Sequence, residues 1–130
     1  MTDANEHIDF ADLHMAATEE TPEVFLTCKA VGCYLKGRSL PENAFEFYRP
    51  IIAWIKAYVD VSKSGLDLTL SFDYLNSSSS RFLFEMLHAM SLSQASESYQ
   101  IKWQVDPDDE LMLEKGEELQ RLLKLKIEIV

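Results

Sequence analysis

Hydrophobic and polar residues alternate strictly in the middle of the chain. Between residues 66 and 74, every second residue is a leucine or an aromatic residue, and the residues between them are polar. A period of two is typical of a β-strand with one buried face. The apolar residues that follow have the i, i+3, i+4, i+7 spacing of an amphipathic helix: Leu83, Met86, Leu87 and Met90. This stretch therefore predicts a strand and then a helix that begins near Ser77.

Similar patterns divide the rest of the chain. Alternation predicts a β-hairpin from Val24 to Lys36 and further strands over 99–105 and 125–129, while the polar stretch 91–98 predicts a loop. A helix is expected from the segment 39–43 to about Asp60, and its apolar stripe includes Phe45, Tyr48, Ile52, Ile55 and Val59. Its start is either Ser39 with Glu42 or Asn43 with Glu46, because both pairs have capping-box spacing. Pro50 predicts a kink or a later start.

The last predicted helix opens at the acidic segment 106–110, whose carboxylates suit the positive end of a helix. Met112, Leu119 and Leu123 mark its buried side. Gly116 falls on the same side, where the absence of a side chain permits close packing against a sheet.

The resulting order is β-β-α-β-α-β-α-β. Strands joined by single helices are expected to be parallel, and the first hairpin adds an antiparallel pair. Strands covered on both faces would be continuous apolar runs, whereas the three later strands alternate. We therefore expect an α/β fold of two layers, with a mixed, mostly parallel five-stranded sheet and helices mainly on one face.

The chain has 130 residues, which favours one domain over 13–130, preceded by a flexible acidic segment at 1–12. No apolar run reaches the roughly 20 residues that cross a bilayer, and the N-terminus has no signal peptide, so we expect a cytoplasmic protein. The formal net charge of −10 argues against nucleic acid and anionic membranes as partners. Cys28 and Cys33 are expected to be reduced core residues rather than a bridge or a metal site.

Four serines stand where the central strand passes into its helix, after Asn76. Asn76 and Ser77 are preferred N-cap types, whose side chains accept from backbone N–H groups at a helix start. A helix start also attracts anions. The run is therefore either a set of capping residues or an acceptor site for phosphate.

The sequence shows no catalytic constellation. Ser77 and His88 are eleven residues apart on one helix, or about 16 Å along its axis, so they cannot form a dyad. His7 and His14 fall in the weakly patterned N-terminal segment. A calcium loop from Asp106 would need glycine where Leu111 stands. No glycine-rich nucleotide loop occurs. We expect no enzyme, no metal and no cofactor.

Three blocks of the sequence resemble those of the bacterial SiaC-like regulatory phosphoproteins. They are LPENAFEFY at 40–48, YLNSSSSR at 74–81, and Trp103 followed by DPDDELMLEKGEE at 106–118. The family has PEN-S-x-E-F-F-like, Y-L-N-T-S-S and D-E-D-M-x-E-x-G-E-like blocks in the same order. The chain departs from it at Ser77, where Thr is usual, at Ala44, where Ser is usual, and at Val105, where Tyr is common. The resemblance extends from about Leu13 to the C-terminus.

The resemblance implies a fold similar to the STAS domains of anti-sigma-factor antagonists, and a switch between partners. A Ser/Thr kinase would phosphorylate Ser77, with Ser78 as a competing site, and a PP2C-type phosphatase would remove the phosphate. The unmodified form would bind and activate a diguanylate cyclase, in cyclic di-GMP signalling linked to aggregation and biofilms. The partner-binding surface would comprise residues from two blocks: Asn76, Ser78, Ser79 and Arg81, with Glu42 and Asn43.

Two other functions fit the same residues. The first is a constitutive STAS-type scaffold or anti-sigma-factor antagonist, in which the serine run only caps a helix. The second is an enzyme with an unfamiliar site.

Overall fold

A computed structural model describes residues 11–29, 31–61 and 65–130. These residues form one sheet of six strands and, on it, three α-helices and a short 3-10 helix. The strands are β1 (Leu13–Met15), β2 (Glu23–Leu26), β3 (Cys33–Ser39), β4 (Asp67–Leu75), β5 (Gln100–Gln104) and β6 (Ile127–Ile129). The helices are α2 (Ala44–Val61), α3 (Ser77–Ser91), η1 (Ser96–Ser98) and α4 (Glu110–Leu122).

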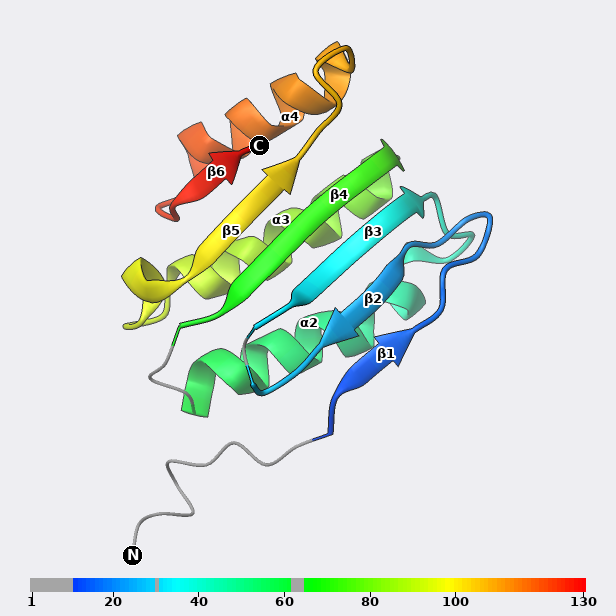
Figure 1. The fold of residues 1–130 in the computed structure, drawn as a ribbon. Helices are drawn as coiled ribbons and strands as arrows, with labels where there is room; N and C mark the ends of the chain where they lie inside the picture. Colours follow the sequence, from blue (N-terminus) through cyan, green and yellow to red (C-terminus); the bar gives the residue numbers. More distant parts are fainter. Residues whose placement is uncertain (1–10, 30, 62–64) are drawn as a thin grey trace, which may run out of the picture.

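The strands lie in the sheet in the order in which they occur along the chain (Figure 1). β1, β2 and β3 pair antiparallel, whereas β3, β4, β5 and β6 pair parallel. One α-helix precedes each of β4, β5 and β6, and η1 also lies between α3 and β5. This confirms the predicted mixed, mostly parallel sheet. The sheet has six strands rather than the predicted five, because Leu13–Met15 pairs with β2. Three half-buried or exposed residues offer too short an alternation to predict a strand.

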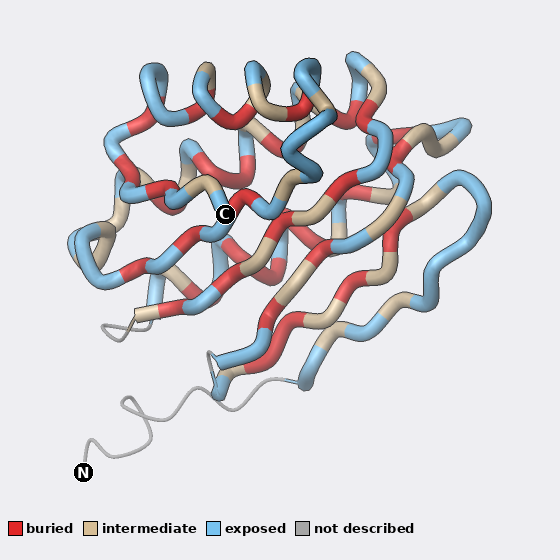
Figure 2. The backbone as a smooth tube through the Cα atoms, turned by 45° about the horizontal axis from the view of Figure 1, so that its top comes forward, coloured by how far each residue is buried: buried red, intermediate tan, exposed pale blue. Residues whose placement is uncertain are grey.

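All three α-helices lie on one face of the sheet (Figure 1). Along the strands, buried positions alternate with exposed or half-buried ones (Figure 2). On the uncovered face, Tyr34 pairs with Thr69 and Thr69 with Lys102, and none of these three is buried. The two-layer arrangement predicted from the alternation is therefore confirmed.

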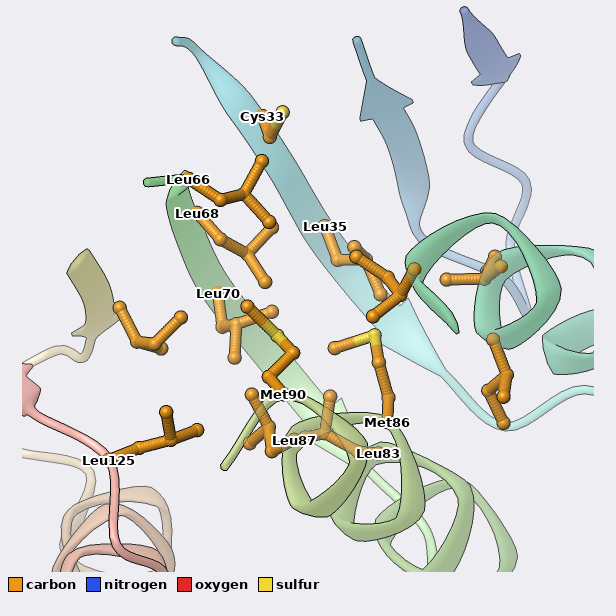
Figure 3. Close-up of a cluster of buried hydrophobic side chains, with 14 of the residues drawn as sticks. Cys33, Leu35, Leu66, Leu68, Leu70, Leu83, Met86, Leu87, Met90 and Leu125 are labelled. Atoms are coloured by element: carbon orange, nitrogen blue, oxygen red, sulfur yellow. The ribbon is translucent and has the colours of Figure 1, made fainter. Parts of the chain in front are cut away.

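The core fills the space between the sheet and the helices (Figure 3). Leucines from β3 and β4, such as Leu35 and Leu70, meet Leu83, Met86 and Leu87 from α3, and all five are 1% exposed or less. The predicted apolar face of α3 is confirmed. This packing fixes how α3 is turned about its axis, and so which residues of its first turn point outward.

Helix α2 begins at Ala44, and Asn43 caps it by accepting from the Glu46 N–H at 3.1 Å. The alternative start at Ser39 is wrong, because Ser39 is the last residue of β3 and is fully buried. Pro50 lies within the helix and does not delay its start.

Helix α4 is capped by Asp109, whose carboxylate accepts from the Met112 N–H at 3.1 Å. Among the described residues, no group of three or more His, Cys, Asp or Glu side chains is placed to hold a metal ion. Gly116 is buried against Trp103 of β5, as the sequence predicts. The Trp103 indole N–H donates to the Met112 carbonyl at 2.8 Å, so ring and helix are held together.

The chain before β1 is described only from Ala11, so the predicted flexible segment 1–12 lies almost entirely outside the described residues. The Ala11 carbonyl accepts from the Trp54 indole N–H at 3.0 Å. Both cysteines are free thiols, and burial raises the pKa of Cys33. Within the described ranges, no helix is long and apolar enough to span a membrane.

Candidate functional site

The junction between β4 and α3 is the single residue Asn76, which stands in an extended conformation between Leu75 and Ser77. Its side-chain oxygen accepts from the Ser79 N–H at 2.8 Å, and its carbonyl accepts from the Ser80 N–H at 2.9 Å. Its own N–H donates to the Ser39 carbonyl at 3.0 Å, at the end of the neighbouring strand. The predicted role of Asn76 as helix cap is thus what the geometry shows.

Two backbone donors at this helix start have no protein acceptor. A helix leaves its first four N–H groups without an intrahelical partner. Asn76 accepts from Ser79 and Ser80, whereas the Ser77 and Ser78 N–H groups have no acceptor in the part of the chain that the structure describes. Because these donors lie at the positive end of the helix dipole, an anion placed there is stabilised.

The four serines of the run have different environments. Ser77 and Ser78 are exposed, Ser80 is half-buried, and Ser79 is fully buried. The prediction that Ser79 belongs to the partner contact is therefore wrong. The rotation of α3 that buries Leu83 one turn later also turns Ser79 inward, since residues four apart share a helix face.

Ser79 belongs to a chain of buried hydroxyl groups. Ser39 Oγ donates to Ser79 Oγ at 2.8 Å, and Ser79 Oγ donates to the Ser39 carbonyl at 3.1 Å. The Tyr48 hydroxyl lies 2.6 Å from Ser39 Oγ, and it must be the donor because the Ser39 proton is already committed. Burial raises the pKa of Tyr48, which keeps this donor protonated. The network ties the starts of α2 and α3 to the end of β3.

Ser79→Ala is expected to destabilise the fold by about 1 to 2 kcal/mol, because it leaves the buried Ser39 hydroxyl without its acceptor. Thermal unfolding followed by circular dichroism measures the loss. The matched control is Ser78→Ala, an exposed residue of the same turn, which is expected to change stability by less than about 0.5 kcal/mol. Equal unfolding temperatures for the two variants would contradict the structural role of Ser79.

The start of α2 lies beside the start of α3. The Phe45 and Phe82 rings are 6.1 Å apart, and Phe82 stacks on Tyr48. Phe45 belongs to the apolar stripe predicted for this helix, yet 58% of it is exposed. Glu42 and Asn43, which precede α2, are also exposed. The sequence does not reveal the Phe45–Phe82 pair, because an aromatic residue at the end of an apolar stripe has the same pattern as a core residue.

A groove of about 460 Å³ separates the end of β4 from α4. Tyr74 and Leu75 line it from the strand, and Glu114, Glu117 and Glu118 line it from the helix. The acidic third block therefore lies near the junction, although it contributes no side chain to the buried hydroxyl network.

Comparisons with known proteins lead to the same family as the three sequence blocks. The model of the SiaC family regulatory phosphoproteins matches residues 15–130. The chain belongs to the SiaC family. The family resemblance predicted from the sequence is thereby confirmed.

Solved structures share the fold of this SiaC-family protein. The chain is 25% identical to apo-SiaC from Pseudomonas aeruginosa, with a TM-score of 0.84 over 92% of this chain and 98% of that one. It is 26% identical, with a TM-score of 0.83, to a chain in the structure of the diguanylate cyclase SiaD in complex with its activator SiaC from the same species. That match covers 91% of this chain and 98% of the other. An uncharacterized protein of P. aeruginosa strain UCBPP-PA14 is 28% identical over 109 residues, which are 83% of this chain and 86% of that protein.

Within this SiaC-family protein, two of the three blocks meet at one place. The block at 74–81 forms the β4–α3 junction, and the block at 40–48 forms the entry to α2. The hydroxyl chain joins them, running from Tyr48 through Ser39, just before the first block, to Ser79. The ring of Phe82, just after the second block, stacks on Tyr48. The chain is therefore a regulatory phosphoprotein of this family, with two exposed serines at the point where the blocks converge.

Proposed function

We propose that this protein is a phosphorylation switch whose acceptor is Ser77. The observation that supports it is the difference within the serine run: Ser77 is exposed beside two unpaired N–H groups, while Ser79 is sealed in the core. A kinase reaches the first hydroxyl and not the second. Ser78 is the competing acceptor, since it is equally exposed and lies in the same turn.

The fold is expected to tolerate the phosphate where a docked partner does not. A phosphate adds about −1.5 to −2 charges. At the start of α3 it meets the two unpaired donors and the positive end of the helix. Enclosed in a protein interface without a cation from the partner, the same dianion costs several kcal/mol of desolvation. The modification then leaves the domain folded and removes the complex.

The proposed partners are those that the family resemblance implies. A Ser/Thr kinase transfers the terminal phosphoryl group of ATP to the Ser77 oxygen, and a PP2C-type phosphatase hydrolyses the ester. The unmodified protein binds and activates a diguanylate cyclase in the cytoplasm, by analogy with the P. aeruginosa SiaC that is described as the activator of SiaD. The protein itself catalyses nothing in this scheme.

The contact surface for the cyclase comprises the half-buried Asn76 and exposed residues of the two adjoining helix starts. From the α3 side these are Asn76, Ser78 and Arg81, and from the α2 side Glu42, Asn43 and Phe45. An aromatic ring at the centre and polar groups around it are the usual make-up of a protein interface.

Incubation with the cognate kinase and ATP, followed by peptide mass spectrometry, tests the acceptor. The expected result is one phosphate on Ser77, which is lost in Ser77→Ala and retained in Ser80→Ala. Phosphate found only outside 77–78 would refute the assignment. A protein from its native host that is unmodified in every growth condition would favour the alternative, a constitutive STAS-type scaffold or anti-sigma-factor antagonist.

A further inference from the structure

Arg81 is placed to face a group attached to Ser77. It follows Ser77 by four residues on α3, a spacing that brings two side chains together on one helix face. Helical side chains tilt toward the N-terminus, so the Arg81 side chain is within reach of the turn that contains Ser77 and Ser78. Both Ser77 and Arg81 are exposed.

Arg81 has no anionic partner in the unmodified protein. Within the described ranges, no carboxylate lies within 4.0 Å of its guanidinium group, and it stacks on no aromatic ring. The carboxylate one turn further along α3 is Glu85, which instead pairs with Lys56 of α2 at 3.7 Å. On its N-terminal side, the helix face that Arg81 occupies carries the two exposed serines.

We propose that Arg81 binds the phosphate on Ser77 within the same helix. This inference rests on the proposed phosphorylation of Ser77 and assigns what holds the phosphate once it is there. The planar guanidinium group presents paired donors that match two phosphate oxygens, and an anion four residues before a cation is the favourable order along a helix. The unpaired Ser77 and Ser78 N–H groups hold the opposite side of the phosphate.

The pairing changes the surface in two ways at once. Before modification, Arg81 offers a solvated positive charge to a partner that binds the proposed contact surface. After modification, that charge is neutralised and a net negative charge stands in its place. The switch therefore withdraws a cation from the contact surface as well as adding an anion.

The second pKa of the phosphate reports the pairing directly. Full-length protein with phosphoserine genetically encoded at position 77 is titrated by ³¹P NMR, without any kinase. Free phosphoserine has a second pKa of about 6, and a paired cation lowers it because it favours the dianion. Arg81→Gln is expected to raise this pKa by about 0.2 to 0.4, which is the interaction of one helical ion pair converted to pKa units. In the phosphoserine protein that keeps Arg81, the Arg81 Nε–H resonance is expected to shift with pH at the same midpoint as the phosphate.

Two controls separate pairing from net charge. Lys126→Gln removes one positive charge just before β6, at the opposite end of the parallel strands, and is expected to leave the phosphate pKa unchanged. Arg81→Lys keeps the charge and is expected to retain most of the shift. An equal pKa in the parent and in Arg81→Gln overturns the inference, as does an equal rise in Arg81→Gln and Lys126→Gln. Because the phosphate is installed without a kinase, these outcomes are independent of whether a kinase modifies Ser77.

Discussion

Phosphorylation of Ser77 is expected to weaken binding to the cyclase partner by at least two orders of magnitude. Each factor of ten corresponds to about 1.4 kcal/mol, and a dianion enclosed in an interface costs several kcal/mol. Ser77→Asp adds only one charge without phosphate geometry, so a smaller loss of about tenfold is expected. Ser77→Ala keeps the parent affinity. Isothermal titration calorimetry of the cognate cyclase against the four forms measures the series.

Two further measurements test whether the loss of affinity comes from the position of the charge rather than from net charge or unfolding. Gln100→Glu adds the same single charge at the opposite end of the parallel strands, and it is expected to leave the affinity within about twofold. The unfolding temperature of Ser77→Asp should equal or exceed that of the parent, because a carboxylate at a helix start contributes about 0.3 to 1 kcal/mol. Equal affinities of the parent, phosphorylated and Ser77→Asp forms would eliminate the switch.

Gly116→Ala is expected to destabilise the protein by about 2 to 3 kcal/mol, which lowers the unfolding temperature by about 10 °C. A Cβ atom at Gly116 would lie 2.5 Å from Cδ1 and 2.8 Å from Nε1 of Trp103. The ring has no room to retreat, because Trp103 is 1% exposed and its N–H is bound to the Met112 carbonyl. Helix propensity alone predicts the opposite sign, a gain of about 1 kcal/mol. Chemical denaturation decides between the two.

A control on the same helix isolates the contact. Glu114→Ala, on the exposed side of α4, is expected to change stability by less than about 0.5 kcal/mol. Trp103→Leu is destabilising by itself. The double variant Trp103→Leu with Gly116→Ala should lose less free energy of unfolding than the sum of the two single losses, since the smaller side chain relieves the clash. Additive losses, or a Gly116→Ala protein as stable as the parent, would contradict this packing.

The sequence predicted most of the secondary structure because local patterns dictated it. The alternation over 66–74 becomes β4, the apolar spacing of Leu83 to Met90 becomes the buried side of α3, and Gly116 lies against the sheet as its position in the pattern indicates. β1 was missed because its place in the sheet comes from antiparallel pairing with β2 and not from an alternating pattern of its own.

The site was predictable only in part. The composition of the serine run and the capping role of Asn76 depend on neighbours in the chain, and both were evident before the fold was known. Which serine faces outward depends on how α3 is rotated against the sheet. The four serines are identical, so the only signal in the sequence is the apolar spacing further along the helix, where Leu83 stands four residues after Ser79.

The amino-acid order by itself therefore determined all of the elements except β1 and η1, the helix start at Asn76 and the family, because period, capping chemistry and motif spacing are local properties. Tertiary structure alone decided that Ser79 is sealed by Ser39 and Tyr48 while Ser77 stays open, that Phe45 lies at the surface, and that Lys56 occupies Glu85 and leaves Arg81 without an anion. Each of these depends on contacts between residues far apart in the chain, which exist only once the helices have packed on the sheet.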